Sequence, residues 1–339
     1  MIKIVLDCFG GDHSPEANVD GAIAALGQFD DLHLILSGDE SALRKCLEGK
    51  SYDPSRIEFL HAPQVIGCNE RPTDVIRLKR DSSMVKAIRL LRDDDSVAAM
   101  VSTGSTGALV AGALTRLGRL RGIIRPAFCP ILPTMNGGLV GICDSGANVE
   151  VKADQLRQFA IMGSIFMETV YGIKNPRVAL LNVGVEPGKG DTLRQEAYKL
   201  LEETECINFV GNMESRELLT GKFDLVVCDG FSGNVLVKGA EGTALELLKK
   251  LKKSIFSRTI YKIGALFMKR MFADLKSFMD YQNYGGSVLI GTSKVVVKGH
   301  GSAKATSVSK CIEQAYRMET GAIGPHIEKE IAKYEHYDV

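Results

Sequence analysis

Six polar loops that contain glycine carry most of the residues in this sequence that could do chemistry. Most of them follow short apolar runs, and they lie at 10–13, 102–107, 144–148, 184–190, 229–234 and 299–302. A strand that ends in glycines just before a helix leaves backbone N–H groups unpaired, and such groups favour an anion such as phosphate. Ligands of open α/β sheets bind outside the carboxyl ends of the strands, so the loops predict a functional edge on a single sheet.

The loop at 229–234 has the most complete strand–loop–helix pattern. Residues 224–228 form a short apolar run that predicts a strand, and the helix after the loop is expected to begin near Asn234. Asp229, Ser232 and Asn234 are therefore candidate phosphate- or substrate-binding residues. One loop of this kind is weak support on its own, because glycine turns after strands are common in every α/β protein.

The first loop, Gly10-Gly11-Asp12-His13, adds an imidazole to the backbone donors. Asp12 could orient His13, and His13 would then donate to a phosphate oxygen or to a developing oxyanion, which makes it a candidate catalytic residue. The alternative is that Asp12 caps the following helix and that His13 is an exposed turn residue. The sequence leaves both interpretations open.

The loop at 102–107 combines hydroxyl groups with glycines at the end of an apolar run. Ser102, Thr103, Ser105 and Thr106, with the backbone of Gly104, suit the binding of phosphate or carboxylate without a charged side chain. Neither the P-loop spacing nor the GxGxxG spacing is present, so ATP hydrolysis and dinucleotide binding of the usual kinds are disfavoured. Ordinary turn and helix-cap chemistry is the alternative.

Carboxylates gather in the loop at 144–150. Asp144 and Glu150, with Asn148, could hold a divalent metal. No third carboxylate or histidine is near in sequence, so hydrogen bonding that fixes the loop is favoured and no metal is predicted. Asp144 and Asn148 stay among the candidate binding residues.

Two further polar residues complete the candidate site. Lys189 lies in a loop with three glycines at a strand end, and it is the candidate for neutralising phosphate in catalysis. A solvated surface lysine is the alternative. His300, in the last of the six loops, is a candidate binding residue.

Nucleophilic catalysis by the protein itself has weak support. The chain has no GxSxG motif, and none of its eight cysteines has a clear base partner in sequence. The cysteines form no CxxC pair and no Cys/His metal spacing, which favours buried, reduced thiols. Direct attack by a bound inorganic anion would need no such nucleophile.

The composition fits a large α/β protein. The chain has 339 residues, of which 45% are hydrophobic, enough for one large domain or two coupled lobes. The net charge of +1 gives no global field that favours nucleic acid. No apolar run approaches the ~20 residues of a membrane span, and the N-terminal run is too short for a signal peptide, so a cytoplasmic protein is expected.

The expected elements alternate along most of the chain. Strands are expected at 2–6, 32–36, 57–60, 97–101, 127–132, 138–143, 177–181, 207–210, 225–228, 288–290 and 294–297. Helices are expected at 15–27, 40–47, 74–79, 84–91, 108–117, 154–171, 192–203, 234–253, 303–318 and 325–334. The short links 133–137 and 291–293 suit antiparallel pairs. The pattern predicts a three-layer α/β/α sandwich with a large mixed, mostly parallel sheet and no linker within residues 1–339.

The segment 254–276 has a different pattern. On an ideal helix, its basic residues fall in one stripe, and these are Arg258, Lys262, Lys269 and Lys276. Its apolar residues cluster on the opposite face, and these are Phe256, Ile260, Ile263, Phe267 and Met271. Interfacial membrane helices have this basic amphipathic pattern. Packing of the apolar face on a dimer partner or on the core is the alternative.

Together these motifs resemble the PlsX family, the phosphate acyltransferases of bacterial phospholipid synthesis. The matching segments are in order and span nearly the whole chain: LDCFGGDHSPE (6–16), STGSTGAL (102–109), DSGANVE (144–150), LLNVGVEPGKG (180–190), DLVVCDGFSGNVLVKGAEG (224–242) and YGGSVLIG…HGS (284–302). The resemblance implies a fold similar to isocitrate and isopropylmalate dehydrogenases and to phosphotransacetylase. It also implies a homodimer and a single domain of two intertwined lobes with a central cleft.

The resemblance further implies a reaction and a set of partners. Acyl-[acyl carrier protein] and inorganic phosphate would give acyl phosphate and free carrier protein, without a cofactor. The product would pass to PlsY, the membrane enzyme that acylates glycerol 3-phosphate. This need favours contact of the segment 254–276 with the inner face of the cell membrane, through Ile260, Ile263, Phe267 and Met271.

Three other functions compete with this one. The first is a phosphotransacetylase-like enzyme that uses an acyl-CoA. The second is an NAD-dependent decarboxylating dehydrogenase, which needs a clustered Asp/Arg set that the sequence does not supply. The third is a non-catalytic scaffold that organises membrane enzymes. Formation of acyl phosphate from purified components would separate all of them.

Overall fold

The computed structural model describes residues 1–67, 70–71, 76–279 and 284–337. Of the predicted helix at 74–79, the first two residues lie outside this part, and residues 76–78 are helical. The other helices and strands follow the order expected from the sequence, with changes that bear on the site.

The first sheet has seven strands in the order β3-β2-β1-β4-β12-β11-β5. Their bounds are β1 Ile2–Asp7, β2 Leu32–Gly38, β3 Ile57–His61, β4 Val97–Ser102, β5 Ala127–Cys129, β11 Ser287–Ile290 and β12 Val295–Lys298. Strands β3, β2, β1, β4 and β12 run parallel, and β11 is antiparallel to both of its neighbours. The predicted antiparallel pair near the C-terminus is confirmed as β11 and β12.

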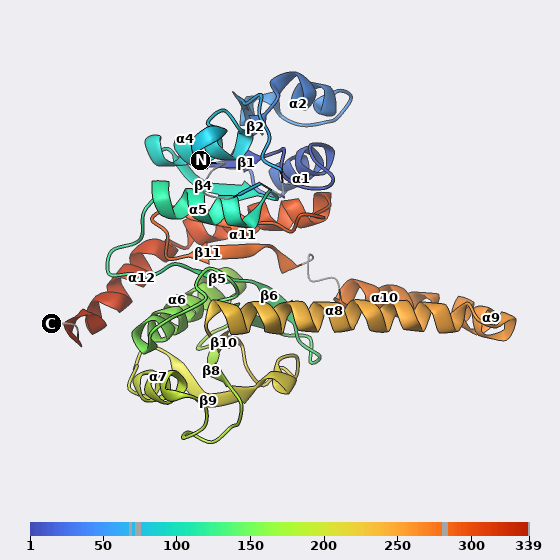
Figure 1. Ribbon diagram of the computed structural model, residues 1–339. Helices are drawn as coiled ribbons and strands as arrows, with labels where there is room; N and C mark the ends of the chain where they lie inside the picture. Colours follow the sequence, from blue (N-terminus) through green and yellow to red (C-terminus); the bar gives the residue numbers. More distant parts are fainter. Residues whose placement is uncertain (68–69, 72–75, 280–283, 338–339) are drawn as a thin grey trace.

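The second sheet has five strands in the order β6-β7-β10-β8-β9. Their bounds are β6 Ile131–Pro133, β7 Leu139–Cys143, β8 Arg177–Asn182, β9 Asn208–Glu214 and β10 Leu225–Val227. All of them run parallel except β6, which is antiparallel to β7. Figure 1 shows this sheet below the first one, with the edge strands β5 and β6 and helix α6 where the two sheets meet.

Helices flank both sheets, except α9 and α10, which lie away from them. They are α1 Glu16–Leu26, α2 Glu40–Leu47, α4 Ser83–Asp93, α5 Thr106–Arg116, α6 Ala153–Tyr171, α7 Thr192–Glu202, α8 Gly230–Ile255, α9 Thr259–Phe267, α10 Lys269–Met279, α11 Ala305–Thr320 and α12 Ile323–Ile331. The fold class predicted from the sequence, mixed and mostly parallel β-structure flanked by helices, is confirmed.

The expectation of a single sheet is wrong, because the predicted strand at 127–132 divides at Pro130. Residues before it form β5 and pair with β11 in the first sheet. Residues after it form β6 and pair with β7 in the second sheet. Proline has no N–H to donate to a ladder, so a strand readily ends there. The prediction that 127–132 pairs with 138–143 in antiparallel fashion is therefore correct only for the residues of β6.

Helix α6 lies at the centre of the core that joins the two sheets. Its large side chains Phe159 and Phe166 are fully buried. They belong to one hydrophobic cluster that also contains Ile4 of the first sheet and Val178 of the second. The two sheets therefore share a core.

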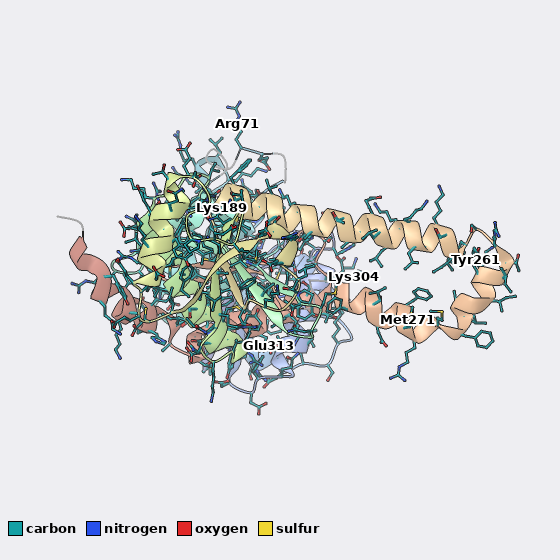
Figure 2. All side chains as sticks on the ribbon, turned by 90° about the horizontal axis from the view of Figure 1, so that it is seen from below. Arg71, Lys189, Tyr261, Met271, Lys304 and Glu313 are labelled. Carbon is teal, nitrogen blue, oxygen red and sulfur yellow. The ribbon has the colours of Figure 1, made fainter. Side chains whose placement is uncertain are left out.

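Helices α8, α9 and α10 form a hairpin that extends away from the body of the protein (Figures 1 and 2). The expectation of one helix over 254–276 is wrong: α8 ends at Ile255, α9 spans Thr259–Phe267, and α10 begins at Lys269. The stripe calculated for one ideal helix therefore does not exist as a continuous face. The side chain of Lys276, part of that stripe, lies outside the described residues.

Candidate functional site

Three of the glycine loops meet at the carboxyl ends of adjacent strands β1, β4 and β12. The N–H of Gly299 donates to the Ser102 carbonyl at 2.9 Å, and the N–H of Asp12 donates to the Gly301 carbonyl at 2.7 Å. A Cβ on Gly10 would lie 2.3 Å from the Cα of Gly104, so this approach requires glycine. The prediction that these loops come together is confirmed, although they use some of their N–H groups to bind one another.

Asp7 and Ser102 form a buried polar cluster that is hydrogen-bonded to these loops. The Ser102 hydroxyl donates to Oδ2 of Asp7 at 2.7 Å and accepts the N–H of Gly104 at 3.1 Å. Burial raises the pKa of Asp7, and the hydroxyls of Ser83 and Ser102 and the charge of Lys298 oppose that rise. Ser102 is fully buried, so its side chain stabilises the loop and is not exposed to a ligand.

The side chains of Thr103 and Ser105 also stabilise the local structure. Thr103 is buried, and its hydroxyl lies within 3.5 Å of the Asn18 amide. Ser105 caps α5 by accepting the N–H of Ala108. The helix-cap interpretation of this loop is therefore correct for Ser105.

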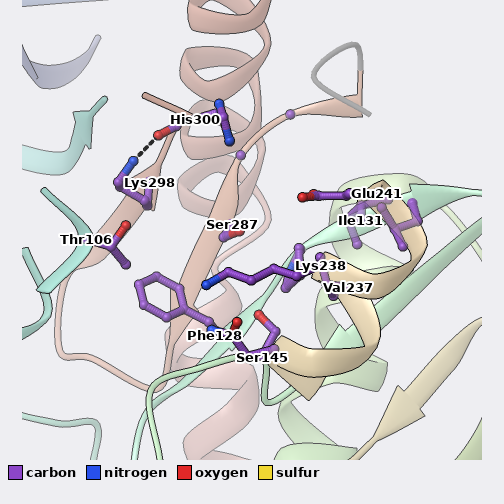
Figure 3. A pocket seen from close by; sticks show the side chains of 16 residues that line it. Thr106, Phe128, Ile131, Ser145, Val237, Lys238, Glu241, Ser287, Lys298 and His300 are labelled. Carbon is purple, nitrogen blue, oxygen red and sulfur yellow. Dashed lines mark hydrogen bonds between the residues drawn. The ribbon is translucent and has the colours of Figure 1, made fainter. Parts of the chain in front are cut away.

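A cavity of about 240 Å³ lies beside these loops, where the two sheets meet (Figure 3). The first sheet and its loops contribute Thr106, Phe128, Ser287, Lys298 and His300. The second sheet and α8 contribute Ile131, Leu132, Ser145, Asn234, Val237, Lys238 and Glu241. Of the residues selected from the sequence, the cavity brings together Thr106, Asn234 and His300.

The cavity has two lysines that the sequence analysis did not select. Lys298 is nearly buried at the end of β12, and its ammonium donates to the carbonyls of Thr103 and Gly299. Lys238 is an exposed residue of α8, and Figure 3 shows it extended across the cavity towards Phe128. His300 lies on the same side as Lys298, with its Nδ1 2.8 Å from the Ser302 hydroxyl. Two ammonium groups at one cavity favour a bound anion.

Glu241 is the acidic residue in this lining. It lies one helical turn after Lys238 on α8, and it is half-buried. Burial raises the pKa of Glu241, and the charge of Lys238 opposes the rise.

The start of α8 differs from the expectation. The helix begins at Gly230, about one turn before the predicted start, and Asp229 caps it by accepting the N–H of Ser232 at 2.8 Å. A Cβ on Gly233 would lie 2.0 Å from the Asp144 carbonyl oxygen. The glycines therefore allow the helix to pack against the 144–148 loop, and they do not form an open anion-binding loop. Asn234, four residues into the helix, lines the cavity.

The carboxylate of Asp144 is fully buried and organises its own loop. It accepts hydrogen bonds at 2.6–3.1 Å from the N–H groups of Phe128, Gly146, Ala147 and Asn148 and from the Asn148 amide. Burial raises the pKa of Asp144, and these hydrogen bonds act against the rise. The arrangement agrees with the favoured interpretation, in which hydrogen bonds fix this loop. Neither Asp144 nor Asn148 lines the cavity.

Other selected residues lie outside the lining of the cavity. Asp229 and Ser232 bind the guanidinium of Arg194, a residue of α7 that the sequence analysis missed. Lys189 is exposed in the loop between β8 and α7, where its carbonyl accepts from the Asn182 amide at 3.0 Å.

The loop at 10–13 also lies outside that lining, and Asp12 and His13 are exposed. Pro15 occupies the cap position of α1, so the suggestion that Asp12 caps this helix is wrong.

Comparison with known proteins identifies the class. A family model described as "Fatty acid synthesis protein" matches residues 2–323, and the chain belongs to this family. A phosphate acyltransferase of Halalkalibacterium halodurans is 45% identical over 332 residues, covering 98% of this chain and 97% of the relative. A phosphate acyltransferase of Clostridioides difficile is 40% identical over 333 residues, with the same two coverages.

Solved structures share the fold at low identity. A phosphotransacetylase from Streptococcus pyogenes superimposes with a TM-score of 0.62 at 16% identity, covering 94% of each chain. A putative 4-hydroxythreonine-4-phosphate dehydrogenase from Salmonella typhimurium gives 0.50 at 14% identity, covering 94% of this chain and 99% of the other. The predicted membership in the phosphate acyltransferase family is confirmed, and the chain is an acyl-transferring enzyme.

Proposed function

We propose that this enzyme transfers a fatty acyl group from acyl carrier protein to inorganic phosphate. The observation that carries the proposal is the cavity where Lys238, Lys298 and His300 gather at the junction of the two sheets. Hydroxyls of Thr106, Ser145 and Ser287 line the same cavity and can donate to a tetrahedral anion. The names of the homologues support phosphate as the acceptor.

The chemistry follows from positioning and charge. A phosphate oxygen attacks the thioester carbonyl carbon, the carbonyl becomes a tetrahedral oxyanion, and the C–S bond then breaks to release the carrier thiol. The lysines neutralise the charge of phosphate, which lowers the electrostatic repulsion between phosphate and the electron-rich carbonyl group. The hydroxyls hold phosphate in position for attack. This step needs no protein nucleophile. Lys189 and His13, selected from the sequence, remain proposed catalytic residues, although neither lines the cavity in this structure.

Purified enzyme tests the proposal directly. Acyl carrier protein loaded with palmitate, mixed with phosphate, is expected to give acyl phosphate, which hydroxylamine converts to a measurable hydroxamate. Palmitoyl-CoA in place of the loaded carrier tests the phosphotransacetylase-like alternative. If neither donor gives acyl phosphate, the proposal fails and a non-catalytic scaffold becomes the better account.

We also propose that the acyl phosphate is used for acylation of glycerol 3-phosphate by a PlsY-type membrane enzyme. The proposed setting is a cytoplasmic homodimer at the inner face of the cell membrane. No helix within the described residues is long and apolar enough to cross a membrane. The exposed apolar residues Val235 and Leu247 of α8 are available for contact with a second copy of the chain.

The tip of the hairpin is the proposed membrane contact. Ile260, Ile263 and Phe267 of α9 and Met271 of α10 are between 46% and 86% exposed, and Phe267 has the largest value. Arg258 and Lys262 lie beside them and can attract anionic headgroups. An exposed apolar cluster flanked by basic residues is typical of an interfacial contact.

We expect Phe267→Asp to weaken flotation with anionic liposomes by tenfold or more at low salt, because burial of a phenyl side chain contributes about 1.5–3 kcal/mol. Ile260→Asp should act in the same direction. Val183→Asp is the matched control, since Val183 is 79% exposed in the β8–α7 loop, away from the hairpin. Wild-type protein that never floats, or equal losses in all three variants, would contradict contact through the tip.

A further inference from the structure

A second hollow continues from the cavity along α8. This groove is lined by Leu132 and Pro133 of β6, by Met135 and Leu219, by one face of α8, and by Phe278 of α10. Nine of its ten lining residues are apolar, and the tenth is Glu241. We refer to it as the α8 groove.

The α8 groove and the cavity share two lining residues, Leu132 and Glu241. Along α8, Asn234 and Lys238 face the cavity, whereas Ala244 and Leu248 face the groove. At a rise of 1.5 Å per residue, Leu248 lies about 15 Å beyond Lys238 along the helix axis. A ligand with its polar end in the cavity could therefore extend a long apolar end along α8 into the groove.

Exposed apolar side chains at the groove indicate that it is open to a ligand. Met135 is 70% exposed and Leu245 is 56% exposed, and they stand on opposite walls, one after β6 and one on α8. Leu219, also in the lining, is partly buried. Large apolar side chains left uncovered around a groove mark a binding surface for an apolar partner.

We propose that the α8 groove binds the hydrocarbon tail of the acyl donor and sets the preferred chain length of the enzyme. The proposal rests on the proposed function, because it assigns the tail of the same substrate whose thioester enters the cavity. Ala240 and Ala244 leave room for the first part of the tail, and Leu248 and Phe278 limit its far end. Longer tails gain apolar contact until they reach that limit.

The test compares acyl donors of increasing length, from butyryl to stearoyl, on the same carrier protein. In the wild type, kcat/KM should rise by about fourfold for each methylene that enters the groove and then level off. Ala244→Leu narrows the groove while keeping a good helix former on α8. It should lower the ratio of kcat/KM for palmitoyl to that for butyryl by tenfold or more.

A second variant should act in the opposite direction. Leu248→Ala removes bulk from the far end, so the chain length at which kcat/KM levels off should increase by several carbons. Thr243→Leu is the matched control for added bulk, because Thr243 is exposed on the same helix and does not line the groove. It should leave the profile of chain length unchanged.

The outcomes separate this proposal from the proposed function. If no donor gives acyl phosphate, the proposed function fails. If acyl phosphate forms but Ala244→Leu and Leu248→Ala both keep the wild-type profile, the groove does not bind the tail. If Ala244→Leu instead changes the oligomeric state with an unchanged profile, a second copy of the chain occupies the groove, and the proposal is overturned.

Discussion

Replacement of Lys238 by methionine is expected to lower kcat/KM for phosphate by about tenfold to a hundredfold. Methionine keeps most of the length of the side chain and removes its charge. A hydrogen bond to a charged group contributes about 1.5–3 kcal/mol, and each 1.36 kcal/mol corresponds to a factor of ten in rate. Lys238 is the clearer test of the two cavity lysines, because the nearly buried Lys298 also binds the carbonyls of Thr103 and Gly299.

Steady-state kinetics with phosphate as the varied substrate measure this effect. Lys249→Met is the matched control, since Lys249 is an exposed lysine of α8 that pairs with Glu246 and lies outside the cavity. Lys189→Ala should be measured beside it, because the sequence predicts a strong loss there too. A large loss for Lys189→Ala with wild-type kinetics for Lys238→Met would place phosphate outside the cavity.

Asp144→Asn is expected to lower the free energy of unfolding by about 3 kcal/mol. The buried carboxylate accepts from four backbone N–H groups and one side-chain amide, and the NH2 of asparagine would face donors on one side. A buried donor left without an acceptor costs about 1–3 kcal/mol. Because Gly233 packs against the same loop, activity should fall with stability.

Denaturation by urea measures the change through the transition midpoint at constant slope. Asp95→Asn is the matched control: its carboxylate is fully exposed beside Lys294, and a surface change of this kind stays within about 0.5 kcal/mol. Unchanged stability of Asp144→Asn together with a large rise in KM for phosphate would instead assign Asp144 to substrate binding, as the sequence alone allowed.

The sequence predicts most of the elements because apolar runs and glycine loops are local signals. The site depends on contacts between distant segments, which such signals do not contain. Lys298 ends the run VVVK just before the loop with His300, so its position at a strand end was a usable signal. Lys238 lies four residues after Asn234, on the same helical face, and that spacing could also have been used.

The wrong expectations have physical causes. Glycines at 230 and 233 suggest a loop by propensity, yet they lie inside α8 because only glycine fits against the 144–148 loop. The stripe at 254–276 was calculated for one straight helix, and the spacing of apolar residues does not reveal the turn between α8 and α9. Pro130 was available as a strand breaker, but the partners of β5 and β6 lie far away in sequence.

Pro130 has a thermodynamic consequence for the enzyme. It joins β5 to β6 as a single residue, and Phe128, Pro130, Ile131 and Leu132 all line the cavity. A ligand in the cavity therefore contacts both sheets at once, and its binding free energy is linked to the folding of both. With a saturating anion, the two halves of the chain should therefore melt together, at a higher temperature than without it.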